Sequence, residues 1–453
     1  MASQATAPAP AHPEAVEPRS VVDGLPPGPR LPAPVQTARL IARPVAFLED
    51  CRRRYGDTFT ARVLRAGTMV FVSDPLSLKR LFAADRQNTI APGRNVVLAP
   101  ILGGRSLLLL EGEEHLRRRK LMLPPFHGER MRAYERVMTE ATEREVAAWR
   151  VGERFRLHES MQAITLEVIL RAVFGVEDDR RRTELRQNLV GILSTTRSPR
   201  AIGLTFASLR RLPSHRRVAQ MLADIDRLLF AEITERRSDP ELEAREDILS
   251  LLVAARFEDG SGMEERELRD QLMTLLLAGH ETTATALAWA FDLLFRAPDK
   301  LRRLREEVDD GGHAYLDAVI EETLRIRPVV PFVGRQLRNG AELGGYQLPA
   351  ETVVMPAIYL THTRSDLYPD PYAFVPERFL DRGTETYSWI PFGGGTRRCI
   401  GGTFAQFEMR VVLATILQHA DLRPATQEPQ RMVRRNVTLS PREGTPAVLA
   451  SRR

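Results

Sequence analysis

A cysteine lies in a glycine-rich loop near the C-terminal end of the chain, in the segment Phe392-Gly393-Gly394-Gly395-Thr396-Arg397-Arg398-Cys399-Ile400-Gly401. A deprotonated cysteine in such a loop can be the protein ligand of a haem iron, and its electron donation favours cleavage of an O–O bond. The glycines allow backbone to approach a flat macrocycle closely. An apolar helical pattern begins directly after Cys399, which places the sulfur at a helix N-terminus whose free N–H groups stabilise negative charge. Taken alone, the same cysteine also fits a buried free thiol beside a turn.

A second group of polar residues, Ala278-Gly279-His280-Glu281-Thr282-Thr283, interrupts a long apolar helical pattern. Burying a carboxylate and a hydroxyl costs free energy unless the protein needs them there. Oxygen activation needs protons, which a hydroxyl backed by a carboxylate can deliver through water, so Glu281 and Thr282 are candidate catalytic residues. The alternative is a helix kink in which Thr282 bonds the carbonyl of Ala278 and Glu281 is salt-bridged. We interpret His280 as structural.

The cysteine loop matches the haem-binding signature of the cytochrome P-450 family, and the chain resembles that family from about Leu25 to its C-terminus. The matching positions are Phe392, Gly395, Arg397, Cys399 and Gly401. The resemblance implies a mainly α fold with a small β region. It also implies haem b (iron protoporphyrin IX) between a long central helix and the helix after the cysteine loop, with Cys399 as the iron ligand. In this family, Glu281 and Thr282 correspond to the acid–alcohol pair of the oxygen-binding groove.

Two further segments, Glu322-Thr323-Leu324-Arg325 and Pro376-Glu377-Arg378-Phe379, resemble the family's scaffold motif. A Glu–Arg pair three residues apart is common on helices and is weak evidence by itself. The resemblance implies that Glu322, Arg325 and Arg378 form a fork-geometry network that braces the cysteine loop. We assign these three residues to folding and haem retention, and not to chemistry.

The resemblance also implies which residues contact the cofactor and the substrate. The expected cofactor contacts are His115, Arg119, Arg335, Phe392, Arg397, Gly401 and Ala278. Among these, the cations would pair with the haem propionates. In part of the family a tryptophan replaces His115, and the segment 115–120 could instead be a solvated basic face. The expected substrate contacts are Leu275, Val329, Val330, Phe332, Leu98 and Leu439. Because these side chains are apolar, we expect a lipophilic substrate such as a terpenoid, steroid or fatty acyl chain.

Composition excludes several other classes of protein. The net charge is +6, but all basic residues except Lys79, Lys120 and Lys300 are arginines, and 59 acids balance them, so we expect no nucleic-acid partner. The two cysteines cannot form an iron–sulfur cluster of four cysteines within the chain. The apolar stretch 272–295 contains charged residues that are costly in lipid, which favours a core helix over a membrane span. Residues 1–24 lack a secretion signal and predict a disordered tail, so we expect a cytoplasmic protein.

Helical periodicity dominates between Glu111 and about Leu417, including 131–149, 161–174, 218–233 and 268–295. Alternating residues predict one β-hairpin over 58–72 and a second over 342–355. Asp74 and Pro75 predict a capped helix start. No linker divides the interior, so we expect residues 25–453 to form a single domain.

The chain lacks a nucleotide-binding Gly-x-Gly-x-x-Gly loop, so the electrons for oxygen activation must come from outside. As in bacterial members of the family, we expect a ferredoxin-type donor with a separate reductase. Arg117, Arg118, Lys120 and Arg398 would provide a basic docking face for that donor. The sequence thus predicts a haem monooxygenase that transfers one atom of O2 to its substrate. A peroxide-using or isomerase-type haem-thiolate enzyme is the first alternative, and a non-catalytic haem sensor or carrier is the second.

Overall fold

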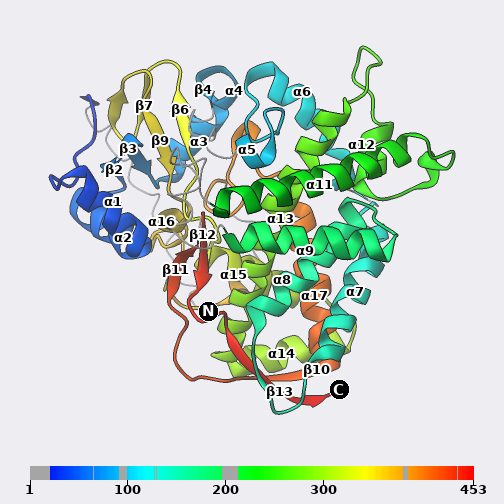
Figure 1. Cartoon of the computed structure of the whole chain (residues 1–453). Helices are drawn as coiled ribbons and strands as arrows, with labels where there is room; N and C mark the ends of the chain where they lie inside the picture. The colour runs from blue at the N-terminus through cyan, green and yellow to red at the C-terminus, as the bar shows by residue number, and fades with distance from the viewer. Residues whose placement is uncertain are drawn as a thin grey trace, which may run out of the picture.

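The computed structural model describes residues 21–64, 66–90, 99–126, 128, 130–195, 213–380, 386–435 and 437–453. Helices make up most of the molecule, and most of the strands gather along one side of it (Figure 1). This arrangement confirms the expected mainly α fold with a small β region. The helices are α1 (Ala33–Ala42), α2 (Pro44–Tyr55), α3 (Pro75–Ala83), α4 (Asp85–Asn88), α5 (Ala99–Leu102), α6 (Gly112–Met122), α7 (Arg130–Ala148), α8 (Leu157–Val168), α9 (Asp179–Thr195), α11 (Pro213–Arg237), α12 (Ile248–Ala254), α13 (Glu265–Phe295), α14 (Pro298–Asp309), α15 (Ala314–Ile326), α16 (Ile358–His362) and α17 (Gly402–His419).

The strands form four small sheets, of which the largest has the order β2-β3-β9-β6-β4. The strands are β1 (Val22–Asp23), β2 (Thr58–Val63), β3 (Gly67–Val72), β4 (Thr89–Ile90), β5 (Arg154–Arg156), β6 (Arg335–Leu337), β7 (Ala341–Leu343), β8 (Tyr346–Leu348), β9 (Val353–Pro356), β10 (Ala420–Pro424), β11 (Met432–Arg435), β12 (Thr438–Pro441) and β13 (Pro446–Arg452). Strands β2 and β3 pair antiparallel, with Thr58 opposite Val72, which confirms the first expected hairpin.

The second expected hairpin, over 342–355, is only partly present. Strands β7 and β8 form a hairpin, but β9 leaves it and pairs with β3 and β6 in the largest sheet. Alternation along a strand does not identify its partner, so the sequence could not separate these two sheets. Strand β1 pairs in parallel with β8, so Val22 and Asp23 belong to a sheet and not to the tail expected for 1–24.

Helix α13 runs through the centre of the molecule (Figure 1). Of the other helices, α8 makes the most extensive contact with it. The stretches 267–276 and 283–294 of α13 are buried, and Trp289 is fully enclosed. Helix α17 packs against α7 and also contacts α13. Within the parts of the chain that the structure describes, no helix is both long and apolar enough to cross a membrane. The core around α13 therefore holds together the two segments that carry Glu281 and Cys399.

Local signals account for where several of these elements begin and end. Asp74 accepts a hydrogen bond from the Ser77 N–H at 2.7 Å, with Pro75 in the first turn, so α3 begins as its capping residue predicts. Helix α15 ends at Ile326, just before Pro328, because the residue that precedes a proline avoids helical geometry. The start of α3 and the end of α15 are thus set by residues next to them in the sequence.

Candidate functional site

The cysteine loop has a tight backbone. Gly393 and Gly395 have φ angles of +69° and +68°, in the region that favours glycine. A Cβ atom on Gly394 would lie 2.5 Å from the ring of Phe82, so that glycine is also required by packing within the protein. The Cys399 N–H donates to the Phe392 carbonyl at 2.9 Å and closes the loop. Helix α17 then begins at Gly402, as the apolar pattern predicted.

Cys399 is accessible to solvent, but many protein atoms surround its sulfur at a greater distance. Burial raises the pKa of the Cys399 thiol, while the Gly401 N–H and the charges of Arg119 and Arg398 act in the opposite direction. The N–H and the cations thus favour a thiolate, but burial outweighs them. Coordination to a metal deprotonates a thiol outright, so an iron bound here would hold the sulfur as its thiolate ligand.

The middle of α13 differs from its two ends. Residues 267–276 and 283–294 are buried, but Ala278 is exposed and 279, 281 and 282 are half-buried, although they lie in the central helix. This short accessible stretch carries the proposed acid–alcohol pair. Small and polar side chains therefore line open space at the position where the oxygen-binding groove was expected.

Thr282 makes the contact of the kink interpretation, whereas the hydrogen bond that Glu281 accepts comes from a neutral amide. The Thr282 hydroxyl donates to the Ala278 carbonyl, and a second carbonyl, that of Gly279, lies 3.4 Å away. The Glu281 carboxylate is turned toward α8, where Gln162 Nε2 donates to its Oε2 at 2.5 Å. These contacts are compatible with catalysis once the groups move, so the catalytic roles of Glu281 and Thr282 stay predictions.

Cations collect on one side of the cysteine loop. His115 is 4% exposed on α6, and burial, followed by the nearby charges of Arg397 and Arg119, lowers its pKa to about 4. Burial also lowers the pKa of Arg119 and Arg397, and neighbouring arginines add to this effect. Half-buried arginines that repel one another fit an acidic ligand such as a pair of propionates. A neutral His115 can still donate an N–H to a carboxylate.

Arg335 lies near Arg397 but already makes hydrogen bonds to other groups of the protein. Its Nε donates to Asp85 Oδ1 at 2.8 Å, and its terminal nitrogens donate to the carbonyls of Gly334 and Gly394 at 2.9 Å. The Thr396 N–H donates to the other oxygen of Asp85 at 2.9 Å. Asp85 is 2% exposed and ties Arg335 to the cysteine loop. Sequence reasoning missed Asp85 because a lone aspartate at the start of a short helix carries no signal.

Burial acts to raise the pKa of Asp85, but Arg335 and the hydroxyls of Thr89 and Thr396 outweigh it, so the net shift is downward. Asp85 is therefore an ionised partner for Arg335 at neutral pH. A propionate at Arg335 would share the guanidinium with this carboxylate.

The scaffold network has the expected fork geometry. Arg325 Nε donates to Glu322 Oε2 at 2.6 Å, and a terminal nitrogen donates to Oε1 at 2.8 Å, with both side chains fully buried. Arg378 Nε lies 3.5 Å from Glu322 Oε1. His362, which the sequence did not indicate, accepts the Ile390 N–H at 2.8 Å and so connects α16 to the approach of the cysteine loop.

The expected substrate contacts divide into two groups. Leu275 and Val329 are buried in the main core, and Leu439 is also buried and donates its N–H to the Val329 carbonyl at 2.7 Å. Phe332 packs edge-on against Phe71, 5.4 Å between ring centroids, within a separate cluster near β2 and β3. Val330 is half-buried. Leu98 lies outside the described residues.

Ion pairs reduce the basic docking face that the sequence suggested. Arg118 is 14% exposed and bonds Glu267 at 2.7 Å, so it is not a surface cation. Arg117 pairs with Asp259, and Lys120 pairs with Glu258 at 2.7 Å. Arg398 is exposed. Acids that are distant in sequence thus neutralise much of this face, which charge counting along one helix could not show.

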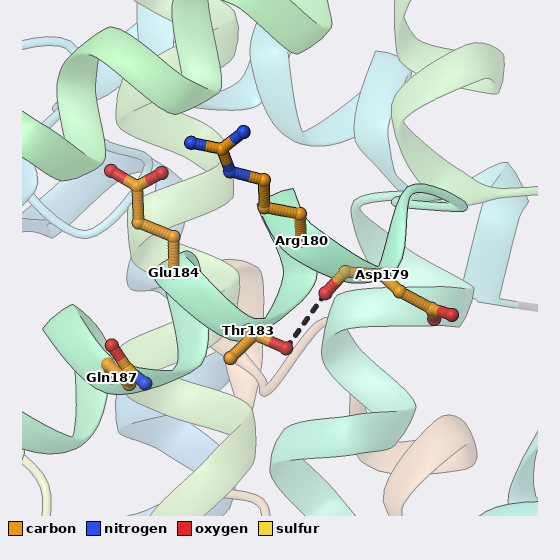
Figure 2. A pocket seen from close by; sticks show the side chains of 5 residues that line it. All are labelled: Asp179, Arg180, Thr183, Glu184 and Gln187. Carbon is orange, nitrogen blue, oxygen red and sulfur yellow. Dashed lines mark hydrogen bonds between the residues drawn. The ribbon is translucent and has the colours of Figure 1, made fainter.

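A shallow surface hollow on α9 has no part in this site. Its lining residues follow one face of that helix, and the Thr183 hydroxyl donates to the Asp179 carbonyl at 2.8 Å (Figure 2). Glu184, also in the lining, pairs with Arg227 of α11. None of the expected site residues lines this hollow.

A buried acid on α17 gives a pH prediction. Glu408 is 2% exposed, it bonds the Thr283 hydroxyl, and its Oε1 has no partner among the described residues. Burial raises its pKa from 4.5 to about 8. The folded protein then keeps a proton that the unfolded chain releases above pH 4.5, so stability falls between pH 4.5 and 8, by about 3 kcal/mol at pH 7.

We expect Glu408→Gln to remove this pH dependence, because the amide keeps the shape of the side chain but does not titrate. Urea unfolding of the haem-loaded protein between pH 5 and 8.5 measures the effect. The matched control is Glu159→Gln, which alters an exposed residue that is paired with Arg156 at 3.1 Å. Parallel stability curves for wild type and Glu408→Gln would contradict the prediction.

The residues around Cys399 fit haem. The sulfur is accessible, a Cβ atom on Gly401 would meet no protein atom within 4 Å, and the half-buried Arg119 and Arg397 lie to one side with the neutral His115. Cys399 would hold the iron, Gly401 would allow close approach of the macrocycle, and His115, Arg119 and Arg397 would face the propionates. The site therefore has the ligand, the space and the charge that a haem-thiolate protein requires.

Comparison with known proteins identifies the family of this chain. The family model described as cytochrome P450 matches residues 25–446. The chain is 44% identical to cytochrome P450 135B1 of Mycobacterium tuberculosis over 93% of this chain and 90% of that protein. It is 40% identical to cytochrome P450 137 of the same organism, with the same two coverages. The chain belongs to the cytochrome P450 family, whose members are haem-containing monooxygenases.

Solved structures share the fold. A retinoic acid-bound cyanobacterial CYP120A1 aligns with a TM-score of 0.81 and 25% identity, covering 96% of this chain and 100% of that one. The haem domain of cytochrome P450DA aligns with a TM-score of 0.83 and 23% identity, covering 96% and 99%. The fold implied by the resemblance is thereby confirmed.

Proposed function

We propose that this monooxygenase transfers one atom of O2 to a lipophilic small molecule of the terpenoid, steroid or fatty acyl type, usually by C–H hydroxylation. We further propose that residues 25–453 act as one haem-thiolate domain and that a ferredoxin-type protein with a separate reductase supplies the electrons. The cytoplasmic location stays a prediction. The observation that carries the proposal is the accessible stretch of α13, because it presents Glu281 and Thr282 inside the core.

When haem is bound to Cys399, it supplies the redox chemistry of oxygen activation. The remaining task falls to side chains of this chain. Thr282 can hold a proton at Oγ1, and Glu281 can exchange one with water at its carboxylate. Release of the Thr282 hydroxyl from the Ala278 carbonyl would free it to donate toward the open side of α13.

Two observations support a lipophilic substrate. Leu275, Val329 and Leu439 are apolar and buried, and the backbones of Val329 and Leu439 are hydrogen-bonded to each other. The solved structure of CYP120A1 holds retinoic acid, a lipophilic molecule. A lipid library screened for changes in the haem absorption of the ferric protein would identify ligands that approach the iron, and the bound ligand would then serve as substrate.

Substitution of the acid–alcohol pair tests the proposed reaction. With the substrate so found, we expect Glu281→Gln and Thr282→Ala to lower product formation about 10²-fold or more, because each removes a proton-transfer group. Consumption of reductant should continue, which would uncouple the two rates. Product yields equal to wild type would contradict the proposed roles of Glu281 and Thr282, and absence of product from the wild type would support the sensor or carrier alternative. Turnover with peroxide but none with O2 and reductant would favour the peroxide-using or isomerase-type alternative.

A further inference from the structure

A buried polar cluster joins α8 to the Glu281 carboxylate. His158 and Gln162 lie one turn apart on α8 and are 1% and 8% exposed. Gln162 Nε2 donates to Glu281 Oε2 at 2.5 Å, and His158 Nε2 lies 3.5 Å from Oε1. Both oxygens of the carboxylate therefore face a nitrogen from α8. Buried groups that contact the proposed acid without contacting substrate are candidates for setting its charge and direction.

The hydrogen bonds of His158 determine which of its nitrogens carries the proton. Arg435 of β11 places a terminal nitrogen 3.3 Å from His158 Nδ1. A guanidinium can only donate, so Nδ1 must accept, and the neutral ring then carries its proton on Nε2. His158 Nε2 lies 3.2 Å from the Thr285 hydroxyl oxygen and 3.5 Å from Glu281 Oε1, so its N–H has an acceptor in either direction. Arg435 thereby selects the tautomer that can donate to the carboxylate.

Hydroxyl groups lie next to His158 Nε2. Thr285 Oγ1 lies 3.4 Å from Ser440 Oγ, which lies 3.1 Å from Thr438 Oγ1. Among the titratable and charged groups in the part of the chain that the structure describes, His158 from α8 lies at Glu281, and Arg435 from β11 lies behind His158. Helix α13 and strand β12 contribute hydroxyls.

We propose that His158 and Gln162 are positioning residues for Glu281: their N–H donors hold its carboxylate ionised and turned toward α8, and Arg435 fixes the His158 tautomer. This inference rests on the proposed role of Glu281 in proton transfer. In the resting arrangement, Thr282 is bonded to Ala278 while Glu281 is bonded to α8, so the two members of the pair are held apart. Hydrogen bonds to a charged group favour the charged form, so loss of either donor should favour protonation of Glu281.

Infrared difference spectroscopy of the ferric resting holoenzyme tests the proposal without turnover. The carboxylic acid band of Glu281 is assigned by its loss in Glu281→Gln and followed from pH 4 to 9. We expect His158→Phe and Gln162→Leu each to move the pH at which this band disappears upward by about one to two units. His158→Gln should restore a value near that of wild type, because its amide N–H can replace Nε2.

The matched control is Ser160→Ala. Ser160 lies between these two residues on α8, but it accepts the indole N–H of Trp149 at 3.0 Å and makes no contact with Glu281. This variant should lose a buried hydrogen bond and keep the titration of Glu281 unchanged. If His158→Phe does not fold, Gln162→Leu alone carries the test, since leucine is close to glutamine in volume.

The same titration pH in wild type, His158→Phe and Gln162→Leu would overturn the proposal, as would an equal shift in Ser160→Ala. These outcomes are separate from failure of the proposed function. If Glu281→Gln forms product as wild type does while the band shifts as expected, the positioning contacts stand and the catalytic role of Glu281 fails.

Discussion

Replacement of Cys399 by serine is expected to abolish the red-shifted carbonyl absorption of the reduced protein. A serine hydroxyl does not provide the thiolate that donates electrons to the iron. Loss of an outer contact in a metal site costs about 10–100-fold in activity, so loss of the ligand itself should reduce turnover by more than that. The measurement is the difference spectrum of the dithionite-reduced, carbon monoxide-treated protein, together with product formation.

The matched control is Cys51→Ala. Cys51 is 3% exposed and packs in the separate cluster near β2 and β3, so its loss should leave the carbonyl spectrum unchanged. Haem content is measured in each variant, because a protein without haem would show no band for a different reason. A haem-loaded Cys399→Ser protein with the wild-type carbonyl band would refute assignment of the iron ligand.

Replacement of Arg325 by lysine is expected to destabilise the fold severely, by about 3–5 kcal/mol. Arg325 uses its guanidinium on Glu322 and on three carbonyls, those of His362, Pro371 and Ala373, at 2.7 to 3.1 Å. Lysine carries three donors on one nitrogen and cannot reach all these acceptors. Both side chains are fully buried, so the Glu322 carboxylate would lose one of its two hydrogen bonds from residue 325 where water cannot replace it.

The same change at an exposed pair is the control. Arg302 and Asp299 have the same spacing on α14, and their side chains are 68% and 87% exposed. Arg302→Lys should change the free energy of unfolding by less than about 0.5 kcal/mol. Urea unfolding and haem retention measure both variants. If Arg325→Lys were no more destabilised than Arg302→Lys, the network would not brace the cysteine loop as we infer.

Local features of the fold were predictable because residues close together in the sequence determine them. The hairpin of β2 and β3 and the start of α3 follow from local alternation and capping. The start of α17 after the cysteine loop follows from apolar periodicity. The spacing of Glu322 and Arg325 indicated that they could meet, since residues three apart share a helix face.

Contacts between distant segments were not predictable. Asp85 reaches Arg335 and Thr396, and His362 reaches Ile390, across separations that carry no sequence signal. The cations at 117–120 suggested an open basic face, but Glu258, Asp259 and Glu267 approach them from the segment before α13 and the start of α13. A charge is free or paired only according to what folding brings beside it.

By itself, the sequence determined the family, the candidate cysteine ligand of the haem and the order of the motifs, because an iron ligand and the glycines around it require particular residue types at fixed spacing. Only the tertiary structure decided where Glu281 points and which groups from α8 meet it. It also decided that Glu408 is buried as a proton-binding acid. The charge state of a carboxyl depends on its solvation and on its neighbours in space, and packing alone sets both.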